Sequence, residues 1–184
     1  QMYDLVFPMI NVRPITESDK VAWLPLWHGY LTFYKVQLPA SQDDLTWSRL
    51  LDPAYESHGL VVDKDGEVQG LAHYSFQTST WAQINNCFLE DLFVNPEVRG
   101  GGLGRALIDE VKEIAIAAGS SRLFWNTDRS NKVARKIYDT YTEESGKVQY
   151  RIPLLEGTSD IPDVGGPYWD RTSDLFDVNE ALYR

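Results

Sequence analysis

A run of glycines between a predicted strand and a predicted helix carries the clearest chemical signal in the chain. The first N–H groups of a helix have no partner within it, and the helix dipole adds positive potential at that end. Glycine also lets the backbone approach a phosphate closely. This stretch therefore predicts a pyrophosphate site, with a flexible surface turn as the alternative. The glycine-rich turn consists of Arg99, Gly100, Gly101, Gly102, Leu103, Gly104 and Arg105.

Other common site motifs do not fit the sequence. A dinucleotide-binding G-x-G-x-x-G would need glycine at Arg105 or Leu107, and a P-loop would need Gly-Lys-Ser/Thr. His28, His58 and His73 show no metal-ligand spacing with Cys or carboxylates, and no Gly-x-Ser-x-Gly elbow is present. We therefore expect neither a metal site nor serine chemistry.

The strands and helices expected around the turn form an α/β (α+β) pattern. A hairpin is expected at residues 63–66, Asp-Lys-Asp-Gly, which suit a tight turn between antiparallel strands. Leu123–Asn126 reads as a short buried strand. The other expected strands are Met2–Val12, Gly59–Val62, Glu67–Phe76, Ile84–Val94 and Lys147–Leu154.

Helix signals recur between these strands. A helix-start pattern at Thr16–Asp19 opens the first, which Pro25 would break or kink, so that two helical pieces are as well supported as one. A second helix follows Ser41, and a third runs from Gly104 towards Gly119, which stands where a C-capping glycine belongs. The last expected helix carries the apolar positions Val133, Ala134, Ile137, Tyr138 and Tyr141.

Composition limits the classes of partner. The chain has 184 residues, which suits one domain, and 17 basic against 27 acidic residues give a net charge of -10. Such a charge repels nucleic acid phosphates. No apolar run reaches the roughly 20 residues that a membrane span needs, and Asp4 and Pro8 interrupt any signal-peptide core. With the single cysteine, Cys87, these features predict a cytoplasmic protein, with the nucleus as the alternative.

The glycine-rich turn matches Arg/Gln-x-x-Gly-x-Gly/Ala, and with Leu92–Pro96 before it and Ala106–Ile108 after it the sequence resembles the GNAT superfamily of N-acetyltransferases. Leu89–Val94 is similar to the diamine acetyltransferases, and the front half is similar to fungal Hpa-type enzymes. The resemblance implies one GNAT domain over residues 1–155, with a mixed, mostly antiparallel sheet flanked by helices. Residues 156–184 would be a C-terminal extension of unknown role.

Acetyl-CoA is the co-substrate that this resemblance implies. The glycine-rich turn would bind its pyrophosphate, and backbone groups of Leu92, Phe93 and Val94 would pair with pantetheine and polarise the thioester. Asn131 and Ala134 would line the cofactor from the last helix. By resemblance to diamine acetyltransferases, Glu90 would relay the amine proton through water and Asp91 would hold a cationic acceptor.

Glu90 and Asp91 would point to opposite faces of an unbroken strand. The alternative reading of both residues is exposed or helix-capping carboxylates.

Tyr138 is the expected general acid. A thiol has a pKa near 8.5 and a tyrosine near 10, so the tyrosine is able to protonate the departing thiolate. Packing in the core is the alternative for this side chain. Direct transfer needs no enzyme nucleophile, so we expect Cys87 to be a buried strand residue.

An aromatic group is the candidate acceptor pocket: Trp23, Trp27, Tyr30 and Tyr34, with Trp81 in a loop. Rings of this kind bind cations or apolar groups, although a stripe at helical spacing is more often core. A family glycine-aromatic turn after Tyr138 is missing, which puts the last two strands in doubt.

The sequence thus predicts acetyl transfer to a primary amine of a small molecule, either an amino acid, including D-amino acids, or a polyamine. Histone or protein lysine acetylation and a non-catalytic acetyl-CoA sensor are the alternatives. A homodimer is expected from the Hpa-type resemblance.

Overall fold

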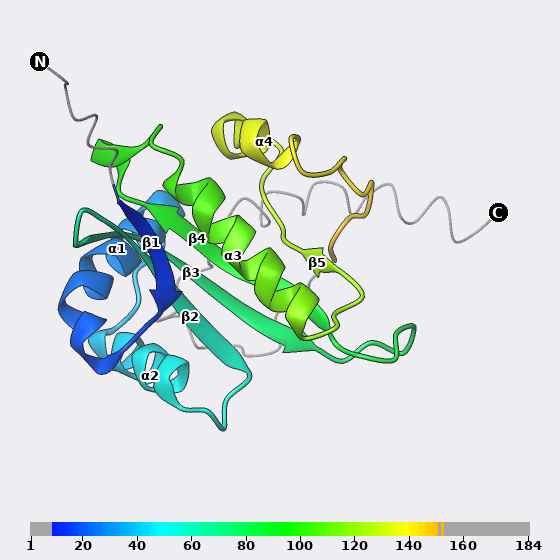
Figure 1. Cartoon of the computed structure of the whole chain (residues 1–184), viewed down its shortest axis with the longest axis horizontal. Helices are drawn as coiled ribbons and strands as arrows, with labels where there is room; N and C mark the ends of the chain where they lie inside the picture. Colours follow the sequence, from blue (N-terminus) through cyan, green and yellow to red (C-terminus); the bar gives the residue numbers. More distant parts are fainter. Residues whose placement is uncertain (1–8, 151, 153–184) are drawn as a thin grey trace, which may run out of the picture. The chain divides into compact units, whose positions relative to one another are not determined.

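The computed structural model of the chain describes residues 9–150 and residue 152 (Figure 1). Two compact units make up the described residues. The first holds residues up to Tyr30 together with Ala40–Asn126, and the second holds Leu31–Pro39 together with the residues from Thr127 onward. All five strands belong to the first unit, and the helix that ends at Tyr138 belongs to the second.

The first unit is built on one five-stranded sheet in the order β1-β2-β3-β4-β5. The first four strands pair antiparallel and β5 pairs parallel to β4, so the predicted mixed, mostly antiparallel sheet is confirmed. The strands are β1 (Ile10–Pro14), β2 (Ser57–Lys64), β3 (Glu67–Gln77), β4 (Asn86–Val94) and β5 (Leu123–Phe124).

The predicted hairpin at residues 63–66 is confirmed by the β2–β3 connection. Asp65 and Gly66 both have positive φ, 56° and 88°. A tight hairpin turn with two such residues matches the twist of antiparallel strands, which explains why Asp-Gly occurs there.

Helices cover both faces of the sheet. Gly104 at the start of α3 (Leu103–Ala117) lies against the Val94 side chain, and Gly29 of α1 (Lys20–Phe33) lies against the Phe93 ring. Val94 and Phe93 are neighbours on β4 beyond its irregular point, so the two helices lie on opposite faces. The second helix, α2 (Ala40–Leu51), packs against β2. In Figure 1, α3 crosses the near face of the sheet.

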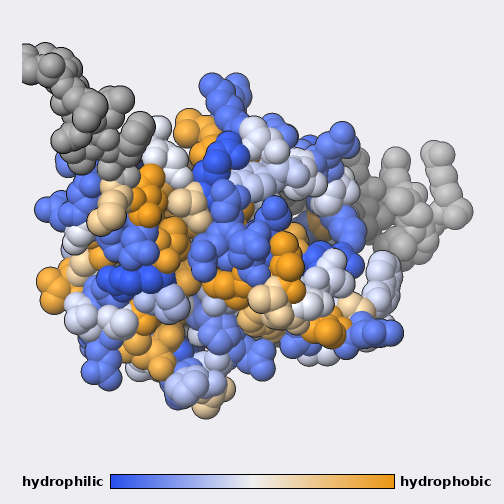
Figure 2. Space-filling model, viewed as in Figure 1, coloured by the Kyte–Doolittle hydropathy of each residue, from blue (hydrophilic) through white to orange (hydrophobic). Residues whose placement is uncertain are grey.

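The longest of the described helices, α3, ends where the sequence predicts. The N–H groups of Gly119 and Ser120 donate to the carbonyls of Ile116 and Ala115, both at 2.9 Å, and Gly119 has φ 71°. This pairing is a Schellman motif, so Gly119 caps the helix as expected. Hydrophilic and hydrophobic residues are intermingled on the face that α3 crosses (Figure 2). The buried stripe beneath comprises Leu103, Leu107, Ile108, Val111 and Ala115.

Pro25 does not divide the first helix, since α1 is continuous from Lys20 to Phe33. The proline removes only the hydrogen bond that its own N–H would make, while the side chains of Trp23 and Trp27 on either side of it are buried. Of the two arrangements that the sequence supported, the single helix is the observed one.

Several predicted elements differ from the structure. The strand expected at Leu123–Asn126 is two residues long and half-buried, and residues 147–150 form no strand. Of the strand expected at Met2–Val12, residues 2–8 lie outside the described part, as do residues 153–184 with the expected C-terminal extension. Within the described residues, no helix is long and apolar enough to cross a membrane.

Candidate active site

The glycine-rich turn has the backbone that its residue types favour. Gly100 and Gly102 have φ 88° and 81°, a region that side-chain-bearing residues rarely adopt, and no atom lies within 4 Å of where a Cβ would be. The Ala106 N–H closes the first turn of α3 by donating to the Gly102 carbonyl at 2.9 Å. The N–H groups of residues 103–105 therefore face the helix end. No acidic residue lies in this first turn, so the potential stays positive.

Arg99 folds back onto β4. Its Nε donates to the Val94 carbonyl at 3.2 Å, and its guanidinium carbon lies 5.7 Å from the centre of the Phe93 ring. These contacts tie the start of the glycine-rich turn to the end of the strand. Of the backbone groups expected to meet pantetheine, the Val94 carbonyl is thus already a hydrogen-bond acceptor.

β4 and β5 separate after a very short contact. Their pairing consists of Cys87 with Leu123 and Phe88 with Phe124, and the described chain shows no further pairs between them. Beyond Phe88, one edge of β4 therefore has no strand partner among the described residues up to Val94. A strand edge without a strand partner offers backbone N–H and C=O groups with which an extended ligand can pair.

An irregularity in β4 changes the direction of its acidic residues. His73 pairs with Asp91 and Tyr74 pairs with Leu89, so Glu90 is an additional residue without a partner on β3. Neighbouring residues of β3 face opposite sides, and paired residues share a side. Leu89 and Asp91 consequently lie on opposite faces, although they are two residues apart.

The expectation that Glu90 and Asp91 face opposite sides applied to an unbroken strand, and β4 is interrupted at this point. With Leu89 on the α3 face and Asp91 on the α1 face, the extra residue lies where the strand changes sides. Glu90 is solvent accessible, yet burial by surrounding protein atoms raises the pKa of its carboxyl, and the Asp91 charge raises it further. The accessible carboxyl is therefore partly desolvated.

His73 is a site residue that sequence reasoning missed. Its Nδ1 lies 2.9 Å from Asp91 Oδ2, and its Nε2 accepts a hydrogen bond from the indole N–H of Trp23 at 3.0 Å. The His73 side chain is buried. Only the register of β3 on β4 brings these side chains together, so no local pattern in the sequence indicates the contact.

Part of the aromatic group lies in the core. Trp27 is buried, stacks on Trp23 and Tyr30 at 5.7 and 5.5 Å, and donates from its indole N–H to Asp43 Oδ1 at 3.0 Å. Tyr30 is half-buried, whereas Trp81 in the β3–β4 loop is 84% exposed. Tyr34 is in the second unit, where it meets Phe33 edge-on.

Three predicted site residues lie on or next to α4 (Lys132–Tyr138) in the second unit. Asn131 caps this helix, since its side-chain oxygen accepts from the Ala134 N–H at 3.3 Å. Tyr138 is the last residue of the helix and is half-buried. Their roles towards a cofactor remain predictions.

Cys87 is fully buried on β4, and burial raises the pKa of its thiol to about 11. A thiol with such a pKa is almost entirely protonated near neutrality, which makes it a poor nucleophile. The expectation of a buried strand cysteine is confirmed.

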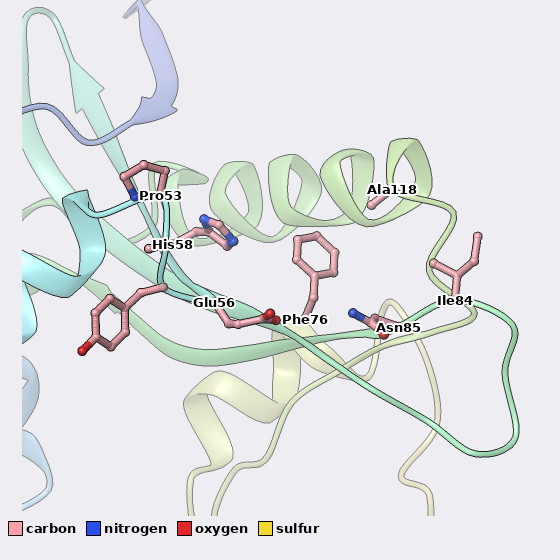
Figure 3. A pocket seen from close by; sticks show the side chains of 9 residues that line it. Pro53, Glu56, His58, Phe76, Ile84, Asn85 and Ala118 are labelled. Carbon is pink, nitrogen blue, oxygen red and sulfur yellow. The ribbon is translucent and has the colours of Figure 1, made fainter.

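A pocket of about 330 Å3 lies away from the predicted site (Figure 3). Ala118, at the C-terminal end of α3, lines it, so it lies about 20 Å from the glycine-rich turn along the helix. None of the predicted site residues borders this pocket. Within the described residues, no three His, Cys, Asp or Glu side chains are grouped as a metal site would require. The pocket is lined by Pro53, Ala54, Tyr55, Glu56, His58, Phe76, Ile84, Asn85 and Ala118.

Comparison with known proteins gives a consistent result. A model described as the acetyltransferase (GNAT) family matches residues 23–141. The D-amino-acid N-acetyltransferase HPA3 of Saccharomyces cerevisiae is 32% identical over 149 residues, which are 80% of this chain and 92% of that protein. The thialysine N-epsilon-acetyltransferase of Bos taurus is 41% identical over 83 residues, or 42% of this chain and 48% of that protein.

Solved structures share the fold at low identity. An aminoglycoside N-acetyltransferase, AAC(6')-Iy, determined in complex with CoA, superimposes with a TM-score of 0.70 at 19% identity, covering 82% of this chain and 99% of that one. A probable acetyltransferase gives a TM-score of 0.70 at 22% identity, covering 79% and 99%. The sheet, its order and the glycine-rich turn are thus set in a fold that other proteins share.

Proposed function

We propose that this chain, which belongs to the acetyltransferase (GNAT) family and is an N-acetyltransferase, moves the acetyl group of acetyl-CoA directly to a primary amine of a small molecule. The amine nitrogen would form a bond to the acetyl carbon while the bond from that carbon to sulfur breaks. The observation that carries the proposal is the glycine-rich turn at the start of α3, which Arg99 ties to the end of β4, the strand that holds Glu90 and Asp91.

The donor would bind at the start of α3. The positive φ values of Gly100 and Gly102, the outward N–H groups of residues 103–105 and the absence of acidic residues in the first turn suit a pyrophosphate. The open edge of β4 suits the extended arm that joins this pyrophosphate to the thioester. Relatives of the same fold include a protein determined in complex with CoA, which supports the same donor class.

Glu90 would take up the proton that the amine must lose. A primary amine with a pKa near 10.4 is mostly protonated at pH 7, and its neutral form costs about 4.6 kcal/mol. The raised pKa of Glu90 makes it a stronger base than an ordinary carboxylate, and solvent access permits a bridging water. The proton for the departing thiolate would come from Tyr138.

The acceptor would be an amino acid, including D-amino acids, or a polyamine. The similarity to a D-amino-acid acetyltransferase and to thialysine acetyltransferases supports this class. Asp91 would bind the ammonium group of such an acceptor, because a carboxylate favours a cation at hydrogen-bond distance.

Turnover by the full chain tests the proposal. The chain is incubated with acetyl-CoA and a D-amino acid, its L enantiomer, thialysine, a polyamine or a basic histone-like peptide, and release of the CoA thiol is followed. We expect turnover with at least one small amine and little with the peptide. Preference for the peptide would show that the acceptor is a protein lysine and not a small amine. Tight acetyl-CoA binding without any turnover would indicate a sensor instead.

A further inference from the structure

We propose that His73 is a positioning residue for this reaction, which holds the Asp91 carboxylate beside Glu90 through a hydrogen-bonded chain that begins at Trp23. The inference rests on the proposed function, in which Asp91 binds a cationic acceptor. It adds to that function a buried imidazole that touches neither donor nor acceptor.

The chain of contacts is continuous and almost entirely shielded from water. Trp23 is fully buried, His73 is 4% exposed, and the Asp91 side chain is 14% exposed. The distances are 3.0 Å from the Trp23 indole nitrogen to His73 Nε2 and 2.9 Å from His73 Nδ1 to Asp91 Oδ2. Only the last member, Asp91, lies beside the accessible carboxyl of Glu90.

The bonding partners fix where the proton lies on the His73 ring. An indole N–H is a donor and has no acceptor capacity, so His73 Nε2 must accept. The ring proton is therefore on Nδ1, from which it points to the Asp91 carboxylate. A doubly protonated ring would place two N–H groups against each other at Trp23. Trp23 thus selects the tautomer that donates to Asp91.

The irregularity in β4 makes this contact possible. Because Glu90 is an additional residue, Asp91 is on the α1 face, directly across from His73. Without the extra residue, Asp91 would lie on the other face and would have no imidazole donor. The His73 ring holds Oδ2 of this carboxylate, and in the proposed function Oδ1 would bind the ammonium group of the acceptor.

Two substitutions separate the two hydrogen bonds. In Asn the amide nitrogen is as many bonds from Cβ as Nδ1 of His, so His73→Asn keeps a donor to Asp91 and loses the contact with Trp23. In Gln the amide is one bond further out, near Nε2, so His73→Gln keeps an acceptor for Trp23 and loses the donor to Asp91. Each variant leaves one of the two hydrogen-bonding partners, Trp23 or Asp91, without its bond to residue 73, so the stabilities of the two variants should be similar.

Kinetics with a cationic amine should distinguish the two. We expect His73→Gln to raise the KM for the amine about tenfold with a smaller change in kcat, because Asp91 contributes binding before and during transfer. His73→Asn should keep this KM within about threefold of the wild-type value, and the KM for acetyl-CoA should be unchanged in both.

His28→Asn is the matched control, because an Asn amide lies near Nδ1 and does not replace Nε2. His28 also pairs with an aspartate, Asp43, through Nε2 and Oδ2 at 2.7 Å, but this pair links α1 to α2 and does not include Asp91. Its loss should leave the KM for the amine unchanged. A role of His73 in stability alone would give His73→Gln and His73→Asn the same KM.

Nitrogen NMR of the histidine rings in the wild-type chain gives a readout that does not need turnover. We expect His73 to show the signature of a neutral ring with its proton on Nδ1, and Trp23→Phe to weaken that preference. A proton on Nε2, or equal KM values in the Asn and Gln variants of an active enzyme, would overturn the inference and leave the proposed function intact. Absence of wild-type turnover with every amine would instead remove the proposed function, and this role of His73 with it.

Discussion

Glu90 combines two properties that a side chain with a purely structural role would not need. It is reached by solvent, and its pKa is raised mainly by burial and then by the charge of Asp91. A raised pKa means that the folded protein favours the protonated form. The associated stability is present at low pH and is lost as the pH rises through the raised value. The ionised carboxylate at neutral pH is therefore a cost to folding, which a catalytic role would explain.

Replacing Glu90 by Gln should lower kcat while preserving the fold. We expect a loss of roughly 100- to 1,000-fold, the usual contribution of a general base, with acetyl-CoA affinity unchanged. The fall of wild-type activity at acidic pH should shift or vanish in the variant, because it reflects protonation of this carboxyl. Calorimetry should show a melting temperature equal to or above that of the wild type.

Glu56→Gln is the control for this change, since Glu56 is an exposed carboxylate in the pocket beyond the other end of α3. It should leave kcat unchanged. Near-native turnover of Glu90→Gln would remove Glu90 from the mechanism without affecting the assignment of the fold.

Tyr138 is tested by removing its hydroxyl group alone. Tyr138→Phe should bind acetyl-CoA like the wild type and lose about 100-fold in kcat, because the thiolate would leave without a proton donor. Rapid kinetics and calorimetric titration with acetyl-CoA measure the two quantities. Tyr150→Phe, at a position that is 82% exposed, supplies the control and should behave as wild type. Equal rates in both variants would show that Tyr138 is a packing residue and not the proton donor.

At the scale of elements, an ion pair holds the passage from β1 into α1. Arg13 donates two hydrogen bonds to Asp19 at 2.7 and 2.8 Å, and Thr16 N–H donates to the same carboxylate at 2.7 Å. Bonding from Arg13, more than any other contact, lowers the pKa of Asp19 from 3.8 to about 2. The stabilisation is thus present above pH 3.8 and is lost as the pH falls through about 2.

Asp19→Asn should reduce the free energy of unfolding by about 1–2 kcal/mol at pH 7, a value reduced for the partial exposure of Arg13. Denaturant titrations at pH 7 and near pH 2 measure the effect, and most of the difference from wild type should be lost at the lower pH. Asp44→Asn breaks the exposed pair with Lys20 and should cost less than about 0.5 kcal/mol. Equal losses at both pH values would contradict the assigned cause.

The glycine-rich turn offers a second test at this scale, with a control matched in backbone geometry. Gly100 and Gly66 have the same φ of 88°, and at neither position would an added Cβ have another atom within 4 Å. Alanine at either should cost about 1–2 kcal/mol of stability through backbone strain. Only Gly100→Ala should also raise the KM for acetyl-CoA, by several-fold, because the cradle would be altered. An equal KM in the two variants would argue against phosphate binding at the turn.

Local patterns account for the elements that were predicted well. The hairpin at Asp65-Gly66, the Gly119 cap and the glycine-rich turn depend on φ values that few residue types adopt, so the sequence specifies them within a few positions. The extra residue at Glu90 and the contact of His73 with Asp91 depend on strand register instead. That register is set by packing of distant segments, which a single strand pattern does not encode.

The misassigned strands have a similar cause. Apolar residues in Lys147–Leu154 suggest a strand, but residues 147–150 are not in a strand. Strand formation depends on pairing and packing with distant segments, which apolar composition alone does not specify. In α1, the sequence allowed a break at Pro25 that the structure does not have. Packing of Trp23 and Trp27 outweighs the local effect of this proline.

The whole molecule carries a net charge of -10, which acts on charged acceptors before they reach the site. A polyamine should be attracted and a zwitterionic amino acid should not. Raising the ionic strength from about 0.01 M to 0.1 M shortens the screening length from about 30 Å to about 10 Å. We expect the KM for a polyamine to rise about threefold over this range while the KM for an amino acid stays constant. Identical salt responses for both acceptors would show that net charge has no part in acceptor capture.

The extra residue in β4 makes Glu90 important in two separable ways. Its carboxyl group belongs to the proposed chemistry, whereas its backbone shifts the alternation of the strand, so that Leu89 faces α3 and Asp91 faces α1. Substitution removes the first contribution and keeps the second. Deletion would instead turn residues on one side of the gap towards the wrong helix. A descendant of this chain that had lost catalysis would therefore be free to change the residue at position 90, but not to shorten the strand there.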